Sequence, residues 1–267
     1  MSSITPASEI LFPDDDESRS RHDLPPVDAT WAPRPAEPYG LAMRRDPGRL
    51  RVAVTAANPL AVEPDDECVR GLRFAAELLA ALGHEVEEAQ PAYPDPSVLD
   101  IFLSVYGPSV GLGIQYGVLL NGREPSDDEI EPLSRALFER AKATSSLGYL
   151  GAVAQLQALA RGIVAFFADY DVLVTPALAE RPLRHGDCNG LGEKPLEDLA
   201  RSGRFTPYGS LFNVTGQPAI NVPVGFGSDG LPTAVQIVGK PLCEDTLLQV
   251  AAKIEAAHPW VHQRPDV

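Results

Sequence analysis

Lys142 and Ser145 have the residue types and the spacing that nucleophilic catalysis can use. A separation of three positions on a helix brings two side chains to one face, and some acyl-transferring enzymes pair serine with lysine in the order Ser-x-x-Lys. Here the order is reversed, and the run Ser145-Ser-Leu-Gly148 also fits a helix end followed by a new helix start. We therefore assign no catalytic role to this pair.

Two other groups carry the chemistry of metal ligands. His84 is followed by three glutamates within four residues, and His185 lies three positions before Cys188. Structural zinc sites combine four ligands in closely spaced pairs, and neither group has a second pair at a helical or hairpin spacing. We expect a solvated edge strand at His84, and no metal or cofactor at either group.

The run Gly111-Leu-Gly113, with Gly117, resembles phosphate-binding loops only in its glycines, which let a backbone approach a phosphate closely. No strand is expected before it, so close packing between helices is the better interpretation. Asn213-Val-Thr215 matches a glycosylation sequon, but no signal peptide is recognised. We expect short polar side chains that bond the neighbouring backbone there.

The elements that position these residues begin with a strand, a helix and a second strand. Arg51–Thr55 is rich in β-branched residues, Asp65 and Asp66 cap a helix with apolar residues at helical spacing, and Gly83 ends it. His84–Glu88 then forms the second strand. This order predicts a βαβ unit with parallel strands.

The middle of the chain is helical. We predict helices over Val98–Leu120 and Leu147–Ala168, and between them a third helix that opens at a capping box, Ser126–Glu129. An apolar strand follows at Asp171–Pro176. Residues Ala177–Arg204 show too little periodicity for a long element, so we interpret them as a loop over a cleft.

Two strands and a helix complete the pattern. Apolar residues alternate with others in Ala219–Val224 and in Ala234–Val238, and Asp229-Gly230 between them suits a turn, which predicts an antiparallel hairpin. Pro223 places the first of these strands at a sheet edge or a bulge. A last helix is expected over Glu244–Ala257. The fold class predicted from these elements is α/β, with a mixed sheet flanked by helices.

The composition excludes several classes of partner. A formal net charge of −15 and a pI near 4.7 argue against nucleic acid and anionic membrane surfaces, which attract basic proteins. No apolar run approaches the roughly 20 residues that span a bilayer, so we expect no membrane partner. Three cysteines without close pairing, and no recognisable leader, favour the reducing cytoplasm.

Four segments follow from these patterns. Residues 1–30 contain seven acidic side chains and little apolar periodicity, which predicts a disordered acidic tail. Residues 31–50 begin as a proline-rich, extended linker. The folded part is expected over residues 51–260, followed by a short tail at 261–267.

Several motifs occur in order along this folded part: DVLVTP from Asp171, FNVTGQPAINVPVG from Phe212, DGLP from Asp229, VQIVG from Val235 and EDTLL from Glu244. In order and spacing they resemble the C-terminal half of the amidase signature family. The resemblance covers about residues 32–260, and residues 1–30 resemble none of it. One small departure is valine before the glutamine, where the family usually has glycine.

The resemblance implies hydrolysis of carboxamide C–N bonds by a serine in a Gly/Ser-rich loop, a second serine preceded by a cis peptide bond, and a lysine base. No Gly-Gly-Ser-Ser or Ser-Gly-Gly run occurs here, so we expect no catalytic residue in this chain and little or no activity alone. The family's Asn-x-Thr-Gly segment buttresses the catalytic loop. The residues expected to line this chain's part of the substrate pocket are Phe102, Tyr106, Thr175, Pro176, Tyr208, Asn213 and Thr215.

Three functions stay open at this point. The chain could act on a small amide together with a separately encoded catalytic half, serve as a non-enzymatic remnant or binding module, or be an independent hydrolase that uses Lys142 and Ser145. A truncated, split or wrongly started gene would give such an N-terminus. Removing half of a central sheet exposes strand edges and apolar faces, so we also expect a partner half or a homodimer.

Overall fold

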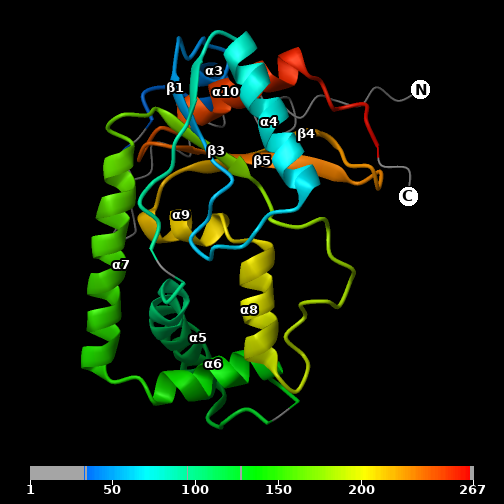
Figure 1. The fold of residues 1–267 in the computed structure, drawn as a ribbon. Coiled ribbons are helices and arrows are strands. Elements are labelled where there is room, and N and C mark those ends of the chain that lie inside the picture. Colours follow the sequence, from blue (N-terminus) through cyan, green and yellow to red (C-terminus); the bar gives the residue numbers. More distant parts are fainter. Residues whose placement is uncertain (1–32, 34, 95, 127, 265–267) are drawn as a thin grey trace.

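The computed structural model describes residues 33, 35–94, 96–126 and 128–264. A five-stranded sheet with the strand order β2-β1-β3-β5-β4 lies between helices (Figure 1). The strands are β1 (Arg51–Val54), β2 (Glu85–Glu88), β3 (Val172–Pro176), β4 (Ala219–Phe226) and β5 (Pro232–Gly239). The predicted α/β class with a mixed sheet is confirmed. The acidic tail predicted at 1–30 and residues 265–267 of the last tail lie outside the described residues.

The predicted βαβ unit is present. β1 pairs in parallel with β2 on one side and with β3 on the other, and α4 (Asp66–Ala81) connects β1 to β2. The Asp65 side chain accepts a hydrogen bond from the Glu67 backbone N–H, so it caps the first turn of α4 as expected. Gly83, with φ of +95°, turns the chain into β2.

The predicted hairpin is also present. β4 and β5 are antiparallel, and β5 pairs with the fully buried β3, which makes the sheet mixed. The register shifts between Pro223 and Gly225, and β4 lies at the end of the strand order. Pro223 therefore lies both at a bulge and on an edge strand, where its missing N–H does no harm.

Two apolar cores lie on the two faces of the sheet. On one face α4 and α10 (Glu244–Ala257) cover alternate residues of β3, β4 and β5. On the other face α7 (Ser146–Phe166) and α9 (Gly209–Thr215) cover Ala53, Leu173 and Val238. Figure 1 shows α5 (Val98–Asn121), α6 (Pro132–Lys142) and α8 (Pro195–Phe205) farther from the sheet on this second side.

Three expectations about local structure need correction. The linker expected at 31–50 contains a short helix, α3 (Tyr39–Ala42), and Gln249 of α10 donates a hydrogen bond to the Ala42 carbonyl. The loop expected at Ala177–Arg204 contains most of α8. Glu129 does accept a hydrogen bond from the Ser126 backbone N–H, but α6 begins only at Pro132, because proline suits the first turn of a helix.

By length and composition alone, α5 and α7 could each cross a membrane. The expectation that no segment has this length is wrong, because glycine, serine and glutamine interrupt the apolar residues without adding charge. Asp100 and Arg161 are the charged residues within these helices. Several large apolar side chains on them are exposed, including Leu112, Tyr116, Leu119, Leu120, Leu147 and Leu150.

Candidate functional site

A polar patch lies at one end of the sheet, where the parallel strands β1 and β3 release the chain into loops. Thr175, at the end of β3, is completely buried and is followed by the buried Pro176. Across the ladder Thr175 lies opposite Gln236 of β5, and Gln236 in turn lies opposite Asn221 of β4. Ligand sites of α/β proteins gather at such strand ends, so this row of polar side chains is the candidate site.

Tyr208 connects this patch to the first strand. It immediately precedes α9, its ring is almost completely buried, and its hydroxyl donates a hydrogen bond of 2.8 Å to the Ala56 carbonyl. Ala56 lies just beyond β1, next to Thr55, whose backbone N–H bonds the Val174 carbonyl of β3. Burial raises the pKa of Tyr208, which keeps the hydroxyl protonated as a donor.

Asn213 and Thr215 lie on α9, which is a short helix where only a turn was expected. The Thr215 hydroxyl donates to the Phe212 carbonyl at 3.2 Å and accepts from the Gln217 N–H at 3.4 Å, as predicted for a residue that bonds the neighbouring backbone. Gly216, with φ of +71°, ends the helix. The Asn213 side chain is exposed, so it is free to meet a group from outside this chain.

Phe102 and Tyr106 belong to a different part of the molecule. Both lie on α5, where their rings stack with centroids 5.3 Å apart. α5 packs on α6 and α7, and Figure 1 shows it beyond α9 from the sheet. The seven predicted pocket residues therefore do not form one group. Thr175, Pro176 and Tyr208 lie at the polar end of the sheet, and Phe102 and Tyr106 lie on the helical layer. Asn213 and Thr215 lie on α9, with Thr215 next to Gln217, which bonds Gly239 at the opposite end of β3.

Gln236 was missed as a candidate residue. It is 7% exposed, and no described residue donates a hydrogen bond to its Oε1. Gln217 has a similar arrangement, because its Nε2 donates to the Gly239 carbonyl at 2.7 Å while its Oε1 has no partner in the described part of the chain. Buried acceptors normally have partners. The sequence did contain a signal for Gln236, because it is a polar residue within an otherwise apolar strand.

Lys142 and Ser145 do not form a catalytic pair. The Lys142 ammonium binds Glu139 at 2.9 Å and lies 4.2 Å from the centre of the Phe138 ring. The Ser145 hydroxyl accepts a hydrogen bond from the Gly148 N–H, so it caps α7. The predicted interpretation of this run as a helix end and a helix start is confirmed.

Replacing Lys142 with alanine is accordingly expected to leave any amide hydrolysis by this chain unchanged. Its ion pair with Glu139 is exposed, and such pairs contribute about 0–1 kcal/mol to stability. Hydrolysis rates and urea midpoints of the variant and the parent would check this. A large loss of hydrolysis rate with an unchanged urea midpoint would instead indicate that Lys142 acts as a catalytic base.

Gly111 confirms the packing interpretation of the glycine-rich run. A Cβ on Gly111 would lie 3.1 Å from the Ala141 Cβ and 3.3 Å from the Phe138 ring, so glycine lets α5 approach α6 closely. Gly113 and Gly117 have nothing within 4 Å of such an atom. Within the described ranges, no cluster of three His, Cys, Asp or Glu side chains could hold a metal ion.

His84 is buried, although a solvated edge strand was expected there. Its Nδ1 accepts a hydrogen bond from the Leu50 N–H at 3.2 Å, and its Nε2 has no partner among the described residues. Burial lowers its pKa, the nearby Lys253 lowers it further, and Asp46 opposes this effect. The next residue along, Glu85, faces Arg49 instead.

This burial predicts a pH dependence of stability. The unfolded chain takes up a proton at His84 near its ordinary pKa of 6.5, whereas the folded protein resists protonation. We therefore expect the free energy of unfolding to fall as the pH falls through 6.5 and below. Urea midpoints at pH 7.5 and 5.5 would show it. His84→Gln should reduce this pH dependence, and His185→Gln, at an exposed position, should leave it unchanged.

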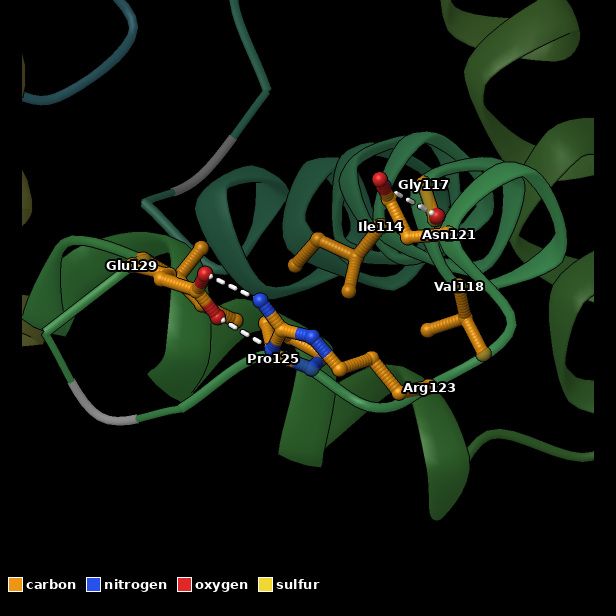
Figure 2. Close-up of a pocket in the computed structure, with 8 residues that line it drawn as sticks. Ile114, Gly117, Val118, Asn121, Arg123, Pro125 and Glu129 are labelled. Atoms are coloured by element: carbon orange, nitrogen blue, oxygen red, sulfur yellow. Dashed lines mark hydrogen bonds and ion pairs between the residues drawn. The ribbon is translucent and has the colours of Figure 1, made fainter.

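Three surface hollows can be described, and none of the three is lined by a predicted pocket residue. One, of about 250 Å³, lies between the end of α5 and the loop to α6. Arg123 bonds both carboxylate oxygens of Glu129 there, at 2.7 and 2.6 Å, and Figure 2 shows the two side chains facing each other. Arg123 and Glu129, the charged residues that line this hollow, therefore neutralise each other. A second hollow lies beside α8, and a third lies between α4 and the β4–β5 hairpin.

Comparisons with known proteins show which family this chain resembles. The family described as Amidase matches residues 17–248, so the match begins inside the acidic segment that was expected to resemble none of the family. The 6-aminohexanoate-cyclic-dimer hydrolase of Pseudomonas sp. (strain NK87) is 35% identical over 91% of this chain and 51% of its own length. The putative amidase AmiB2 of Mycobacterium tuberculosis (strain ATCC 25618 / H37Rv) is 35% identical over 89% of this chain and 50% of its own.

Solved structures give the same result. A 6-aminohexanoate cyclic dimer hydrolase complexed with substrate superposes with a TM-score of 0.78, at 33% identity, over 91% of this chain and 52% of that chain. A bacterial aryl acylamidase shares the fold with a TM-score of 0.69 at 19% identity. The chain spans about half the length of the relatives that it matches. With the family match extending over most of its residues, the chain belongs to the amidase signature family.

Proposed function

We propose that this chain supplies the C-terminal part of an amide hydrolase, and that the nucleophilic serine, the second serine and the lysine come from the other half of a protein of the relatives' length. The observation that carries the proposal is the 35% identity to a 6-aminohexanoate-cyclic-dimer hydrolase over 91% of this chain and half of that enzyme. The absence of a Gly/Ser-rich catalytic run in these 267 residues is consistent with this division.

In the proposed reaction, the serine attacks the carboxamide carbonyl, the C–N bond breaks as the amine leaves with a proton, and water releases the acyl group from the serine. This chain would provide the fixed surface beside that serine. Thr175 and Tyr208 are held by burial and by backbone hydrogen bonds, while Asn213 is presented at the surface of α9. A rigid support of this kind lets a reacting loop keep its geometry.

The substrate class we propose is a small uncharged amide. The named relative hydrolyses the cyclic dimer of 6-aminohexanoate, and simple aliphatic and aromatic amides share its reacting group. We would test these amides first, together with that cyclic dimer.

Mixing this chain with the separately expressed N-terminal half of the Pseudomonas enzyme is expected to restore amide hydrolysis that neither part shows alone. Released amine would be measured for each part and for the mixture, with co-elution in gel filtration as the test of association. Activity of this chain alone would mean that it contains its own nucleophile. An associated but inactive mixture would contradict the proposal.

A second candidate function is a binding module without catalysis. The missing serine motif favours it, because the polar patch around Thr175 and Gln236 could still hold an amide without cleaving it. Saturable binding of the same amides to this chain alone, with no hydrolysis in the associated mixture, would support this alternative. A homodimer that covers the apolar faces of α5 and α7 is compatible with either function.

A further inference from the structure

Residues 38–49, which we call the strap, run along α10 before the chain enters β1. Tyr39 begins α3 and lies near the two acidic residues in the first turn of α10, whose charges add to burial in raising its pKa. One turn further along α10, the Gln249 side chain donates a hydrogen bond of 3.0 Å to the Ala42 carbonyl. Figure 1 shows α3 beside α10. The first part of the strap is therefore docked on this helix.

The last part of the strap is held by a turn and by a histidine. Asp46 binds the Lys253 ammonium, near the end of α10, at 2.8 Å, and it accepts a hydrogen bond from the Gly48 N–H at 2.8 Å. After this turn the Leu50 N–H donates to His84 Nδ1 at 3.2 Å. The strap thus joins the sheet at a hydrogen bond whose acceptor is an imidazole nitrogen.

Little apolar surface holds the strap in place. Among residues 35–49, Ala42 is the one buried residue, and the Asp46 side chain is 71% exposed in its ion pair. Leu50 differs, because its side chain belongs to the core and its carbonyl accepts a hydrogen bond from the Glu85 N–H at 2.8 Å. Segments with few buried contacts open at a lower cost than the whole domain unfolds. The strap can therefore open as far as Leu50 while the sheet stays folded.

The His84 ring can hold the strap only while it is neutral. Because Nδ1 accepts the Leu50 N–H, the neutral ring carries its proton on Nε2. A second proton would occupy the lone pair that Leu50 uses, so the bond to Leu50 must break when the ring becomes a cation. The ring is 6% exposed, and its Nε2 has no partner in the described part of the chain. The closed strap therefore offers a poor environment for the cation.

The charges around His84 come from several elements. Burial lowers its pKa and Lys253 of α10 lowers it further, whereas Asp46 of the strap, already bound to Lys253, raises it. Beside β2, Arg49 and Glu85 pair with each other at 3.5 Å. α4 contributes a backbone carbonyl, which accepts from the His84 N–H. The net effect in the closed strap is resistance to protonation, and opening the strap removes the burial that causes most of it.

We propose that His84 is a pH-dependent clasp: the neutral ring holds the strap against α10, and the protonated ring releases residues 38–49 while the sheet stays folded. The open strap takes up a proton near the ordinary pKa of 6.5, whereas the closed strap resists it. The ratio of open to closed chains should therefore rise as the pH falls, by up to about tenfold between pH 7.5 and 5.5. This inference does not depend on the proposed function.

Amide hydrogen exchange of the full chain tests the clasp at the Leu50 N–H, with rates corrected for the intrinsic effect of pH. The Thr55 N–H, which bonds the Val174 carbonyl between β1 and β3, reports opening of the sheet. We expect Leu50 to exchange faster than Thr55 and to lose up to about tenfold in protection between pH 7.5 and 5.5. Low concentrations of urea should accelerate exchange at Thr55 but hardly at Leu50, because opening the strap exposes little surface.

Two variants separate the proton from the hydrogen bond. His84→Asn keeps a side-chain oxygen that can accept the Leu50 N–H near the position of Nδ1, and it does not titrate, so Leu50 should be equally protected at both pH values. His84→Leu has no acceptor and should leave Leu50 weakly protected at both. At pH 7.5 it should also speed trypsin cleavage after Arg44 and Arg45, which are exposed on the strap, with the products assigned by mass.

Three results would overturn the clasp. The same urea dependence at Leu50 and Thr55 would mean that the strap opens only with the sheet. Equal protection of Leu50 at the two pH values would mean that the strap does not respond to protonation. The same loss in His84→Asn as in the parent would place the titrating group elsewhere. If a variant does not fold, the comparison of Leu50 with Thr55 in the parent chain still decides.

Discussion

Replacing Tyr208 by alanine is expected to lower the free energy of unfolding by about 3–5 kcal/mol, a large part of the stability of a typical domain. The ring is 2% exposed and fills the space between α9 and the loop after β1. Its hydroxyl bonds the Ala56 carbonyl, and the Tyr208→Phe variant would leave that carbonyl without its donor, at a cost of about 1–2 kcal/mol. Urea unfolding at pH 7.5 would measure both variants.

These two variants also decide whether Tyr208 supports the fold or contacts the substrate. It was predicted to line the substrate pocket, and in the structure its ring is 2% exposed and lines none of the three hollows described above. If Tyr208 only supports the fold, Tyr208→Ala should destabilise the protein more than Tyr208→Phe does. The KM of the complemented enzyme should then change little in Tyr208→Phe. A raised KM with full stability in Tyr208→Phe would show that the hydroxyl contacts substrate.

The sequence could predict those elements whose signals are local. Alternating apolar residues located β4 and β5, Asp229-Gly230 located the turn between them, and Asp65 marked the start of α4. These patterns depend on residues only a few positions apart. They predicted the parallel unit and the hairpin, which are two of the four strand pairings, whereas the pairings of β3 with β1 and β5 were not predicted.

Short elements were harder to recognise. α8 has apolar residues at helical spacing only in Leu196, Leu199 and Ala200, and this short stripe was overlooked, although Pro195 and the acidic Glu197 and Asp198 are typical of a helix start. The candidate site was harder still. The contact of Tyr208 with Ala56 spans 152 positions, and the opposition of Thr175 and Gln236 depends on strand register. Neither can be read from neighbouring residues.

Replacing Arg181 by alanine is the second change for which we expect a large effect, about 2–3 kcal/mol of lost stability. This side chain follows β3 and reaches across to the β4–β5 loop, where it bonds both Asp229 oxygens at 3.0 and 2.6 Å and the Leu231 carbonyl at 2.7 Å. The approach is close, since a Cβ on Gly227 would lie 2.7 Å from Nη2. Without the guanidinium, the Leu231 carbonyl keeps only the Gly227 N–H at 2.9 Å and Asp229 Oδ1 keeps only the Leu231 N–H at 3.1 Å, so the charge-assisted bonds between the two strand ends are lost.

Arg201 offers a matched control, because it also bonds a carboxylate through two nitrogens but is 39% exposed where Arg181 is 17%. Arg201→Ala should therefore cost about 1 kcal/mol or less. The pH dependence gives a second check. Arg181 lowers the pKa of Asp229 from 3.8 to about 2, so the contribution of this pair is present above pH 4 and is lost as the pH falls towards 2. If both arginine variants lose the same small amount, the loop is held by its backbone turn, and the β4 edge does not depend on this ion pair.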